Sequence, residues 1–594
     1  MKALFTLEEM SEMNIQTDFI FTSQSNFSKY LNQFHTKNGI KLAEQMIVFV
    51  VEPTENNMEN LIFANSMLNI PVKTTDLSII FVPAETPEII EYLITMHHLN
   101  CFEIYSFSID IIPTDYDLYS MDAEDSFREI YIDKNYSTIG QLANILLKFE
   151  VAFGKVKYKY IKGNLAKYLS DILSKKEEEH NIKSNDEVFG MIILDRTIDL
   201  ITPLLRNLTY EGLINDFFGI EKGSITVKRK FLTSKFTKED KDKSPDENMK
   251  YPLTLDMNRF YCTLRCFHYQ TVSNYLDSIN NQIEQIQGKI NGNTNLSDYN
   301  DALTKLNKYL SWKTFTHDNR VLLGHLFKNL YEDADYKIRE TRERSILNGD
   351  PQTDSERFYD DYISEKKDLY KILNIIILES LTQGGIKNYE SLKRDILSIY
   401  GYQNIFLFRN LETLGWIKEK DKISLKKLFN SNHQQIVEKL NLINRDFKLG
   451  KTDDISYVGQ GYCPITLKLI EKVGENGWSE IKEGLQLIPG ETDFPKNEYE
   501  ISNPSEKVNN IFVVFLGGVT YTEIEGIRYL NRKYKKIYDN STEENKTRKQ
   551  FIIVTTQILN SKKLYDNLGK KFGLQYTIKQ FYNDINSVPD KKKK

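Results

Sequence analysis

The sequence predicts an α/β protein interrupted by a large helical insertion. Short β-branched runs alternate with helical segments in the first third of the chain. From Leu255 a helical periodicity replaces them for roughly 200 residues, and the alternation returns in the last part. The length of 594 residues exceeds what one hydrophobic core holds, so we expect about four structural units.

The predicted strands are short apolar runs bounded by polar residues and prolines. Such runs are typical of strands buried in a parallel sheet. We expect them at Met46–Val51, Leu77–Val82, Val188–Leu194, Ile511–Leu516 and Phe551–Thr555. A crossover helix fits Asn57–Leu68, a turn near a domain edge fits Ile112–Asp117, and the lysine-rich stretch Lys228–Lys250 favours an exposed loop.

The predicted helices follow from apolar residues spaced by threes and fours. A helix capped by Ser137 or Thr138 carries Ile139, Leu142, Ile145, Leu146, Phe149 and Phe153 on one face. A narrow seam then runs through Val272, Leu276, Ile279, Ile283, Ile286 and Ile290, resumes at Leu303, Leu306 and Leu310, and continues through Val321, Leu322, Leu326 and Leu330. This pattern predicts a helical hairpin with its tip near Lys308–Thr316. Later helices are expected at Lys366–Glu379, Tyr389–Tyr400, Ser431–Arg445 and Thr522–Tyr534.

Composition and charge exclude several classes of protein. A net charge of -5 and a pI near 6.1 disfavour a nucleic-acid partner, which usually requires a basic excess. The chain carries no apolar run long enough to span a bilayer and no secretory pattern at Met1–Asn14. Its four cysteines form no disulfide framework, so we expect a cytosolic protein that reaches membranes through other molecules.

Asp195 and Arg196 follow a predicted strand, with Asp199 and Thr202-Pro203 close behind. Strand ends of open α/β sheets often carry active sites, so an acid–base role is one interpretation. Thr-Pro is equally what a helix start requires, and the aspartates can pair with Arg196. We favour the structural interpretation of these residues.

Gly517-Gly518 lies between a predicted strand and a helix. Free amides there could hold an anion, but no third glycine follows, so a tight turn that lets strand and helix pack closely is favoured. Cys262, Cys266 and His268 lack a second matched pair of ligands. We therefore predict no catalytic residue, no metal site and no cofactor.

Several passages resemble the SM family, the Sec/Munc regulators of SNARE proteins. The segment Met191–Ile220, MIILDRTIDLITPLLRNLTYEGLINDFFGI, is similar to that family's hallmark stretch. Four further passages resemble the class C subgroup of the family: Ile111–Phe127, Leu378–Lys387, Asp454–Pro464 and Phe515–Leu530. The matches keep their order over nearly the whole chain.

The resemblance implies an arch-shaped SM fold and a role without catalysis. It implies an α/β domain at 1–134, a discontinuous α/β domain at 135–250 and 496–594, a helical hairpin domain at 251–365 and a second helical part at 366–495. It further implies a chaperone of SNARE proteins and a subunit of the HOPS and CORVET tethering complexes, peripheral on endosome and vacuole or lysosome membranes. The implied partners are SNARE proteins, a helical class C subunit resembling vacuolar protein sorting-associated protein 16, and other tethering subunits.

The resemblance also suggests which residues bind. By position, the SNARE-binding tip comprises Lys308, Tyr309, Trp312, Lys313 and Arg320, types that often dominate interfaces, although Tyr309 and Trp312 could instead pack inside the hairpin. The class C partner is expected near Asp454, Ile455, Tyr457 and Tyr462. A nucleotide-binding enzyme using Asp195 and Gly517, or a plain scaffold without SNARE affinity, are the alternatives.

Overall fold

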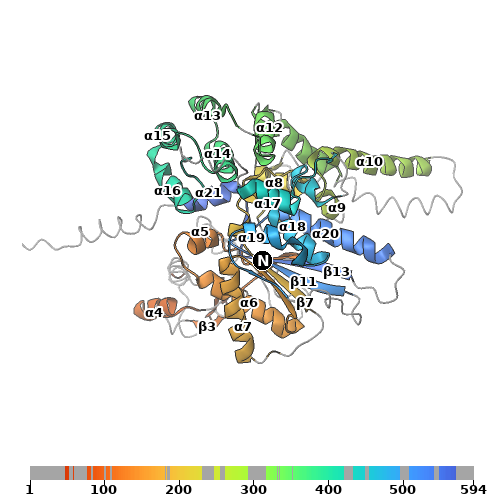
Figure 1. Ribbon diagram of the computed structural model, residues 1–594. Coiled ribbons are helices and arrows are strands. Elements are labelled where there is room, and N and C mark those ends of the chain that lie inside the picture. Colours follow the sequence, from red (N-terminus) through yellow and green to blue (C-terminus); the bar gives the residue numbers. More distant parts are fainter. Residues whose placement is uncertain are drawn as a thin grey trace, which may run out of the picture. The chain divides into compact units, whose positions relative to one another are not determined.

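Figure 1 shows the computed structural model of the chain. The structure describes all residues except 1–46, 52–57, 59–76, 82–84, 99–101, 107–109, 181, 183–187, 222, 230–246, 254–260, 292–315, 331, 334, 351, 421–431, 449–453, 496–507, 541–547 and 570–594. The chain forms two compact units, Met1–Ile112 and Pro113–Lys594.

The first unit contains a parallel sheet in the order β1-β2-β3. Its strands are β1 (Ile47–Val51), β2 (Leu77–Phe81) and β3 (Glu103–Ser106). Helix α4 (Pro87–Thr95) connects β2 to β3 and begins where the Thr86 hydroxyl accepts a hydrogen bond from the Ile89 amide. Both predicted strands of this region are confirmed, whereas the predicted helix Asn57–Leu68 falls almost wholly outside the described residues.

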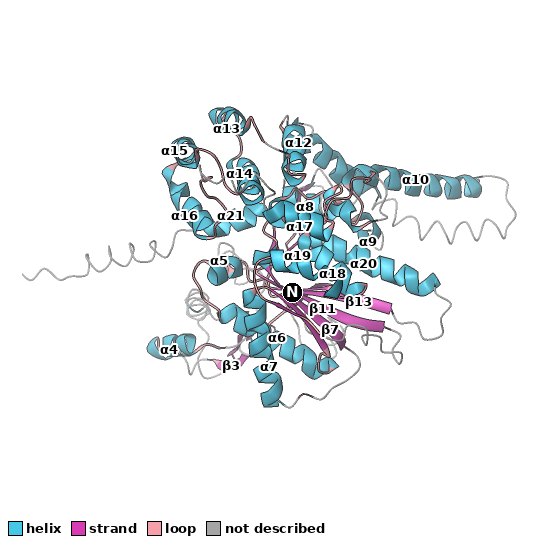
Figure 2. Cartoon of the chain, viewed as in Figure 1, coloured by secondary structure: helices cyan, strands magenta, loops and turns pink. Residues whose placement is uncertain are grey.

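A seven-stranded sheet forms the centre of the second unit, in the order β10-β6-β7-β11-β13-β5-β4. Strands β6, β7, β11, β13 and β5 run parallel, while β10 is antiparallel to β6. The strands are β4 (Ile112–Asp115), β5 (Leu118–Ser120), β6 (Tyr158–Lys162), β7 (Val188–Asp195), β10 (Thr492–Asp493), β11 (Val508–Leu516) and β13 (Arg548–Thr555). Figure 2 shows these strands in magenta between helices.

Strands β4 and β5 lie inside the region that the sequence assigned to the first domain, 1–134. They pair in the sheet of the second unit, so the division between compact units comes earlier, at Ile112. The turn expected at Ile112–Asp117 is therefore a strand followed by a short turn at residues 116–117.

Helices cover both faces of the seven-stranded sheet. Helix α6 (Ser137–Phe153) packs on one face, where Phe149 stacks on Phe512 of β11 at a centroid distance of 5.3 Å. Helix α20 (Tyr521–Asn540) packs on the other face, where Tyr534 contacts Phe551 of β13. Because Ile511 pairs with Phe551, Phe512 and Phe551 point to opposite faces of the sheet.

The chain leaves this sheet after β7 and returns to it for β10 and β11. Strands β7 and β11 are parallel neighbours although most of the helical residues lie between them in sequence. Those helices are α8 (Tyr210–Phe218), α9 (Tyr261–Leu264), α10 (Tyr269–Asn291), α12 (Tyr336–Leu347), α13 (Ser355–Ser364), α14 (Leu369–Gln383), α15 (Tyr389–Tyr400), α16 (Ile405–Thr413), α17 (Asn432–Leu440), α18 (Ile465–Gly474) and α19 (Lys482–Leu487). The predicted interruption of the sheet by helices is present.

Most of the predicted hairpin seam is buried where the structure describes its side chains, and Val321 is partly buried. Val272, Leu276, Ile279 and Ile283 of α10 are buried, as are Leu322, Leu326 and Leu330 of the helix at residues 316–330. Most of these join one apolar cluster with α8 and with the antiparallel hairpin of β8 (Ser224–Lys228) and β9 (Asn248–Pro252). The predicted tip near Lys308–Thr316 lies outside the described residues up to residue 315.

Three further local predictions differ from the structure, and one strand was not predicted. Residues 248–250 belong to β9 and not to an exposed loop. Helix α6 begins earlier than predicted, after Tyr136, whose side chain makes no capping hydrogen bond, and Thr138 lies inside the helix, where its hydroxyl donates to Glu129. Phe153, expected on the buried face of α6, is 43% exposed. Strand β6 was not predicted, because its sequence YKYIK mixes lysine with tyrosine and lacks an apolar run.

Candidate functional site

The described part of the hairpin presents a polar surface above its buried seam. Arg320, one of the five predicted SNARE contacts, forms an ion pair with Asp277 of α10, and both side chains are about half exposed. The pair links the two helices of the hairpin across their surface. The other predicted contacts, Lys308, Tyr309, Trp312 and Lys313, lie outside the described residues.

The residues Asp195, Arg196 and Asp199 form a buried polar network. Nη1 of Arg196 donates to both carboxylate oxygens of Glu523, at 2.9 and 2.8 Å, while Nε and Nη2 donate to the Asp199 carbonyl at 3.0 and 2.7 Å. One nitrogen thus contacts both oxygens of the carboxylate, and charge-assisted hydrogen bonds of this kind are stronger than neutral ones. Arg196 is 2% exposed, so its guanidinium is occupied inside the fold.

The carboxylates of this network act as caps. Asp199 accepts from the amide and hydroxyl of Thr202, at 3.0 and 2.7 Å, and from the Ile465 amide at 3.0 Å. Pro203 follows Thr202 as the second residue of a short 3-10 helix, Thr202–Leu204. Asp199 thus joins the turn after β7 to the start of α18, which fits the structural interpretation of these residues.

Asp195 is held in the same way, by groups from three segments. It accepts from the Tyr131 hydroxyl at 2.6 Å, the Thr197 amide at 3.0 Å and the Leu165 amide at 3.2 Å. Burial, and then the Asp195 charge, raise the pKa of Tyr131 well above its ordinary value, so this hydroxyl keeps its proton and donates it.

Gly517 and Gly518 allow this network to pack against the strand end. Both have positive φ, of 90° and 109°, which favours glycine. A Cβ at Gly517 would lie 2.6 Å from the Tyr131 ring and 3.0 Å from Cβ of Arg196, and one at Gly518 would lie 2.5 Å from Leu559. Close approach of side chains therefore accounts for both glycines.

A second buried charge cluster surrounds Arg528 of α20. Its Nη1 donates to Glu211 and Glu525, each at 2.6 Å, and its Nη2 donates to Asp115 at 2.8 Å. Burial raises the pKa of Glu211. For Glu525, the charges of Arg528 and Arg265 outweigh the effect of burial, so the pKa of Glu525 is lowered. Sequence reasoning missed this cluster because its members are far apart in the chain.

The residues predicted to contact a class C partner are largely interior. Ile455, Tyr457 and Tyr462 are 1–3% exposed, and only Asp454 is partly accessible. The Tyr457 ring packs against Tyr529 of α20 at 5.5 Å, and its hydroxyl donates to the Cys266 carbonyl at 3.3 Å. Both rings are enclosed by their own chain, so neither tyrosine offers the exposed surface that a docking anchor requires.

Three exposed apolar side chains stand close together in sequence where α15 meets α16. Ile399, Tyr402 and Ile405 are 37%, 72% and 46% exposed within seven residues of sequence. Gly401, with a φ of 100°, ends α15 and redirects the chain into α16. Contiguous exposed apolar surface is typical of interaction sites, so this junction is a candidate for one. The sequence signal was weak, since the apolar spacing of these helices does not reveal which face is covered.

The described residues contain no group of three or more histidine, cysteine, aspartate or glutamate side chains arranged to hold a metal ion. Within the same part of the chain, no helix combines the length and apolarity that crossing a bilayer requires.

The sequence profile of the Sec1 family matches residues 4–567. The chain belongs to the Sec1 family. This confirms the SM resemblance. Similar proteins include a vacuolar protein-sorting-associated protein 33 homolog of Arabidopsis thaliana, 26% identical over 493 residues that cover 80% of this chain and 78% of the relative. Vacuolar protein sorting-associated protein 33A of Rattus norvegicus is 27% identical over 541 residues, covering 88% and 87%.

Solved structures of Sec1-family proteins share the fold. The SM protein Vps45 in complex with the Qa SNARE Tlg2 gives a TM-score of 0.55 at 13% identity, covering 92% of this chain and 91% of that one. The Unc18–syntaxin 1 complex from Monosiga brevicollis gives 0.54 at 14% identity, covering 90% and 89%. At these identities the likeness confirms the predicted α/β fold with its helical insertion.

Proposed function

We propose that this Sec1-family chain is an SM-type chaperone of SNARE assembly and a subunit of class C tethering complexes of the HOPS and CORVET type. It acts without catalysis on the cytosolic side of endosomes and of the vacuole or lysosome, held there by its partners. Its similarity to vacuolar protein sorting relatives supports the location, and the SNARE complexes of two solved relatives support the partner class.

The observation that carries this proposal is the hairpin with a buried seam. Isolated SNARE segments are largely disordered in this family's partners, and nucleating a helix is unfavourable, with a nucleation constant on the order of 10⁻³. A surface that holds two segments in register supplies part of that ordering in advance. The hairpin must be stiff to do so, because a flexible surface would itself lose entropy on binding.

Its base provides that stiffness. Val272 and Leu276 of α10 pack in one cluster with Leu322 and Leu326 of the facing helix, and all four are 0–1% exposed. Each buried leucine contributes roughly 2 kcal/mol of transfer free energy. The Arg320–Asp277 ion pair adds a contact between the two helices at their surface.

A test of the chaperone role reverses two charges at the predicted tip. The variant K308E/K313E should capture endolysosomal SNARE motifs at least fivefold more weakly than the unchanged chain in a pull-down. The control K328E changes a lysine whose side chain is 64% exposed on the described hairpin helix, and should bind as before. Undiminished capture by K308E/K313E would favour the scaffold alternative, and saturable micromolar binding of ATP or GTP in calorimetry would favour the enzyme alternative.

We further infer that the helical class C partner docks on the exposed patch of Ile399, Tyr402 and Ile405. The patch lies in the second helical part, where the resemblance places that partner, and it offers the apolar area that the enclosed Tyr457 and Tyr462 do not. Asp454 remains a candidate for a polar contact, since it is partly accessible.

The variant Y402D tests this proposed docking surface. Placing a carboxylate in an apolar contact should abolish co-purification with the class C partner while leaving SNARE capture intact. Tyr105, 53% exposed in the first unit, supplies the control Y105D. Loss of the partner in both variants, or in neither, would remove the patch as the docking surface.

A further inference from the structure

Two exposed tyrosines lie side by side on neighbouring helices. Tyr136 immediately precedes α6, and Tyr168 belongs to α7 (Asn164–His180), which packs against α6. Their ring centroids are 5.7 Å apart, and the rings are tilted by 56° to each other. Tyr136 is 37% exposed and Tyr168 is 45% exposed. Neither hydroxyl has a hydrogen-bond partner among the described residues, so both are available to donate to another molecule.

An open space lies one helical turn away from Tyr136. Gly140 follows Tyr136 by four residues, and residues at that spacing lie one above the other on a helix. A Cβ added to Gly140 would have no heavy atom within 4 Å, and the φ of this residue is not in the left-handed region. Neither packing among the described residues nor backbone conformation therefore requires glycine, which destabilises a helix relative to alanine. Its effect is to leave room beside the two rings.

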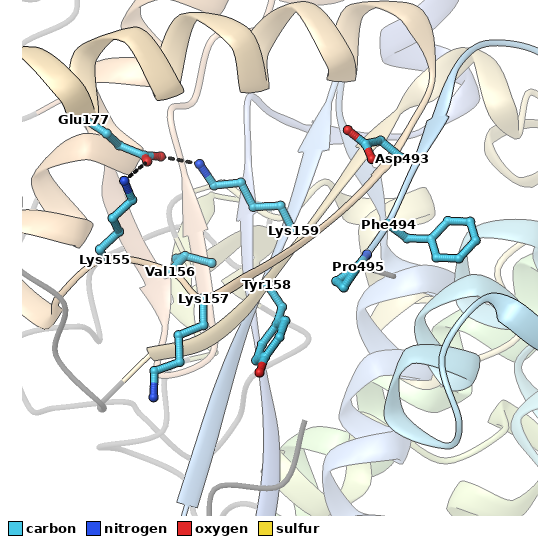
Figure 3. Close-up of a pocket in the computed structure, with 9 residues that line it drawn as sticks. All are labelled: Lys155, Val156, Lys157, Tyr158, Lys159, Glu177, Asp493, Phe494 and Pro495. Atoms are coloured by element: carbon cyan, nitrogen blue, oxygen red, sulfur yellow. Dashed lines mark hydrogen bonds and ion pairs between the residues drawn. The ribbon is translucent and has the colours of Figure 1, made fainter. Parts of the chain in front are cut away.

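Helix α7 is held to the sheet by ion pairs near both of its ends. Lys167 pairs with Asp493 of β10 at 3.1 Å. Figure 3 shows Glu177, near the other end of α7, between Lys155 and Lys159, and it pairs with both lysines. The Glu177 pairs are the stronger anchor, because the carboxylate of Glu177 is buried. The tyrosine of α7 is therefore presented by a fixed element, which loses little freedom when a ligand binds.

The turn that leads to Tyr136 presents a positive charge. Lys134 has a φ of 57°, in the left-handed region that favours glycine, so a lysine there carries backbone strain. The Asn135 amide closes this turn by donating to the Glu129 carbonyl at 2.9 Å, at the end of α5 (Ser126–Tyr131). Lys134 is exposed, and no described carboxylate lies within ion-pair distance of its ammonium group. An uncompensated cation thus stands two residues before an exposed aromatic ring.

These features match what a proline-rich segment in the polyproline II conformation offers. Such a segment has no internal hydrogen bonds, so its carbonyls remain to accept hydrogen bonds from tyrosine hydroxyls. It rises about 3.1 Å per residue, so residues two apart are separated by roughly 6 Å, close to the distance between the two ring centroids. Aromatic side chains are the usual contact surface for proline-rich segments, which lose little entropy on binding because their conformation is already formed.

We propose that Tyr136 and Tyr168 bind a proline-rich segment of a partner protein, which carries an acidic residue beside its prolines. Prolines of the segment pack on the two rings, and its backbone carbonyls accept hydrogen bonds from the tyrosine hydroxyls. The space left by Gly140 admits the segment close to α6, and the acidic residue pairs with Lys134. The surface uses no residue of the hairpin or of the exposed patch between α15 and α16, so it stands or fails separately from SNARE capture and from docking of the class C partner.

Fluorescence anisotropy with a labelled acetyl-PPPPPPDE-amide peptide and the full chain tests the proposal. The peptide should bind, and Y136A/Y168A should weaken its binding at least tenfold. The matched control Y105A/Y402A removes two other exposed tyrosines and should alter binding less than twofold. The peptide acetyl-AAAAAADE-amide keeps the charge but lacks prolines, so it should bind at least tenfold more weakly. Cooperative thermal melting of both double variants excludes misfolding as the cause.

Two further variants test the roles of the glycine and the lysine. G140A should raise the melting temperature, because alanine favours a helix, yet weaken peptide binding at least fivefold, because its Cβ fills the open space. K134E should reverse the charge preference and bind acetyl-PPPPPPKK-amide more tightly than the acidic peptide. Absence of binding, equal binding of the alanine peptide, or undiminished binding by Y136A/Y168A would overturn the proposal. Unchanged binding by G140A, or a retained preference of K134E for the acidic peptide, would also contradict it.

Discussion

In this protein, burial determines which charged side chains have a structural role. Arg196 and Arg528 are almost fully enclosed, and each is surrounded by carboxylates from distant segments of the chain. Breaking such a pair leaves a buried charge without its partner, which costs about 3–5 kcal/mol. Both arginines therefore fix the packing of α20 on the sheet, and the suspected acid–base role of Asp195 and Arg196 has no access to solvent.

Glu150 gives a residue-scale prediction with a defined pH window. Burial, opposed by the Lys159 charge, raises the pKa of Glu150 to about 7, above its ordinary value of 4.5. The protonated form is thus favoured in the fold, so its stabilising contribution is complete below about pH 4.5 and is lost as the pH rises through 7. We expect E150Q to raise the free energy of unfolding by about 1–2 kcal/mol at pH 8 and to leave it nearly unchanged at pH 5.

Urea denaturation at the two pH values measures this difference. The exposed Glu178 on the neighbouring helix provides the control E178Q, which should shift neither midpoint. A gain in stability from E150Q that is the same at pH 5 and pH 8 would contradict the assigned titration.

Elements were predictable where one side chain pattern dominated them. Strands β7, β11 and β13 are apolar runs buried on both faces, and the hairpin seam repeats at helical spacing, so local sequence suffices to find them. Strand β6 alternates lysine and tyrosine, and its place in the sheet depends on Lys159 reaching Glu177 and Tyr160 reaching Trp478. Those contacts are long-range, so local sequence could not reveal them.

The same limit explains the outcome for the candidate sites. Tyr457 and Tyr462 stand in a turn-rich segment, where aromatic residues can be anchors or core, and only the assembled fold, including the packing of Tyr457 on Tyr529 of α20, shows them to be enclosed. Tyr402 is the opposite case. It is the most exposed of the large apolar side chains described, and nothing in its local sequence indicates this. Exposure is a property of the assembled elements and is not encoded at a single position.

At the element scale, the hairpin seam should control both stability and capture. Leu276 is fully buried against the helix at residues 316–330, so L276A should cost about 2–5 kcal/mol and loosen that contact. Hydrogen exchange of α10 should accelerate, and SNARE capture should weaken, because the surface is no longer rigid. Q282A, on the exposed face of α10, is the control, and unchanged capture by a loosened hairpin would argue against a template mechanism.

The whole molecule depends on segments that are remote in sequence. Strand β11 lies between β7 and β13, and β13 pairs with β5. The sheet is therefore continuous only when the last part of the chain is present. The helical insertion is thereby fixed at both ends to one sheet. The base of the hairpin is linked to the sheet through α8, which follows β7 in the chain and contributes residues to the same apolar cluster.

Truncation tests that dependence directly. A chain ending at Pro495 lacks β11, α20 and β13, which leaves the facing edges of β7 and β5 unpaired and removes Glu523 and Arg528 from their buried partners. We expect it to aggregate, as measured by soluble yield and size-exclusion chromatography, because open apolar strand edges recruit other chains. A chain ending at Gly569 keeps every described element and should remain monodisperse. Co-expression of residues 496–569 with the shorter chain should restore solubility, since the missing strands can enter from a separate fragment. A soluble, cooperatively melting chain ending at Pro495 would mean that the inserted helices fold independently of the sheet, and the hairpin would then lack the fixed base on which its template role depends.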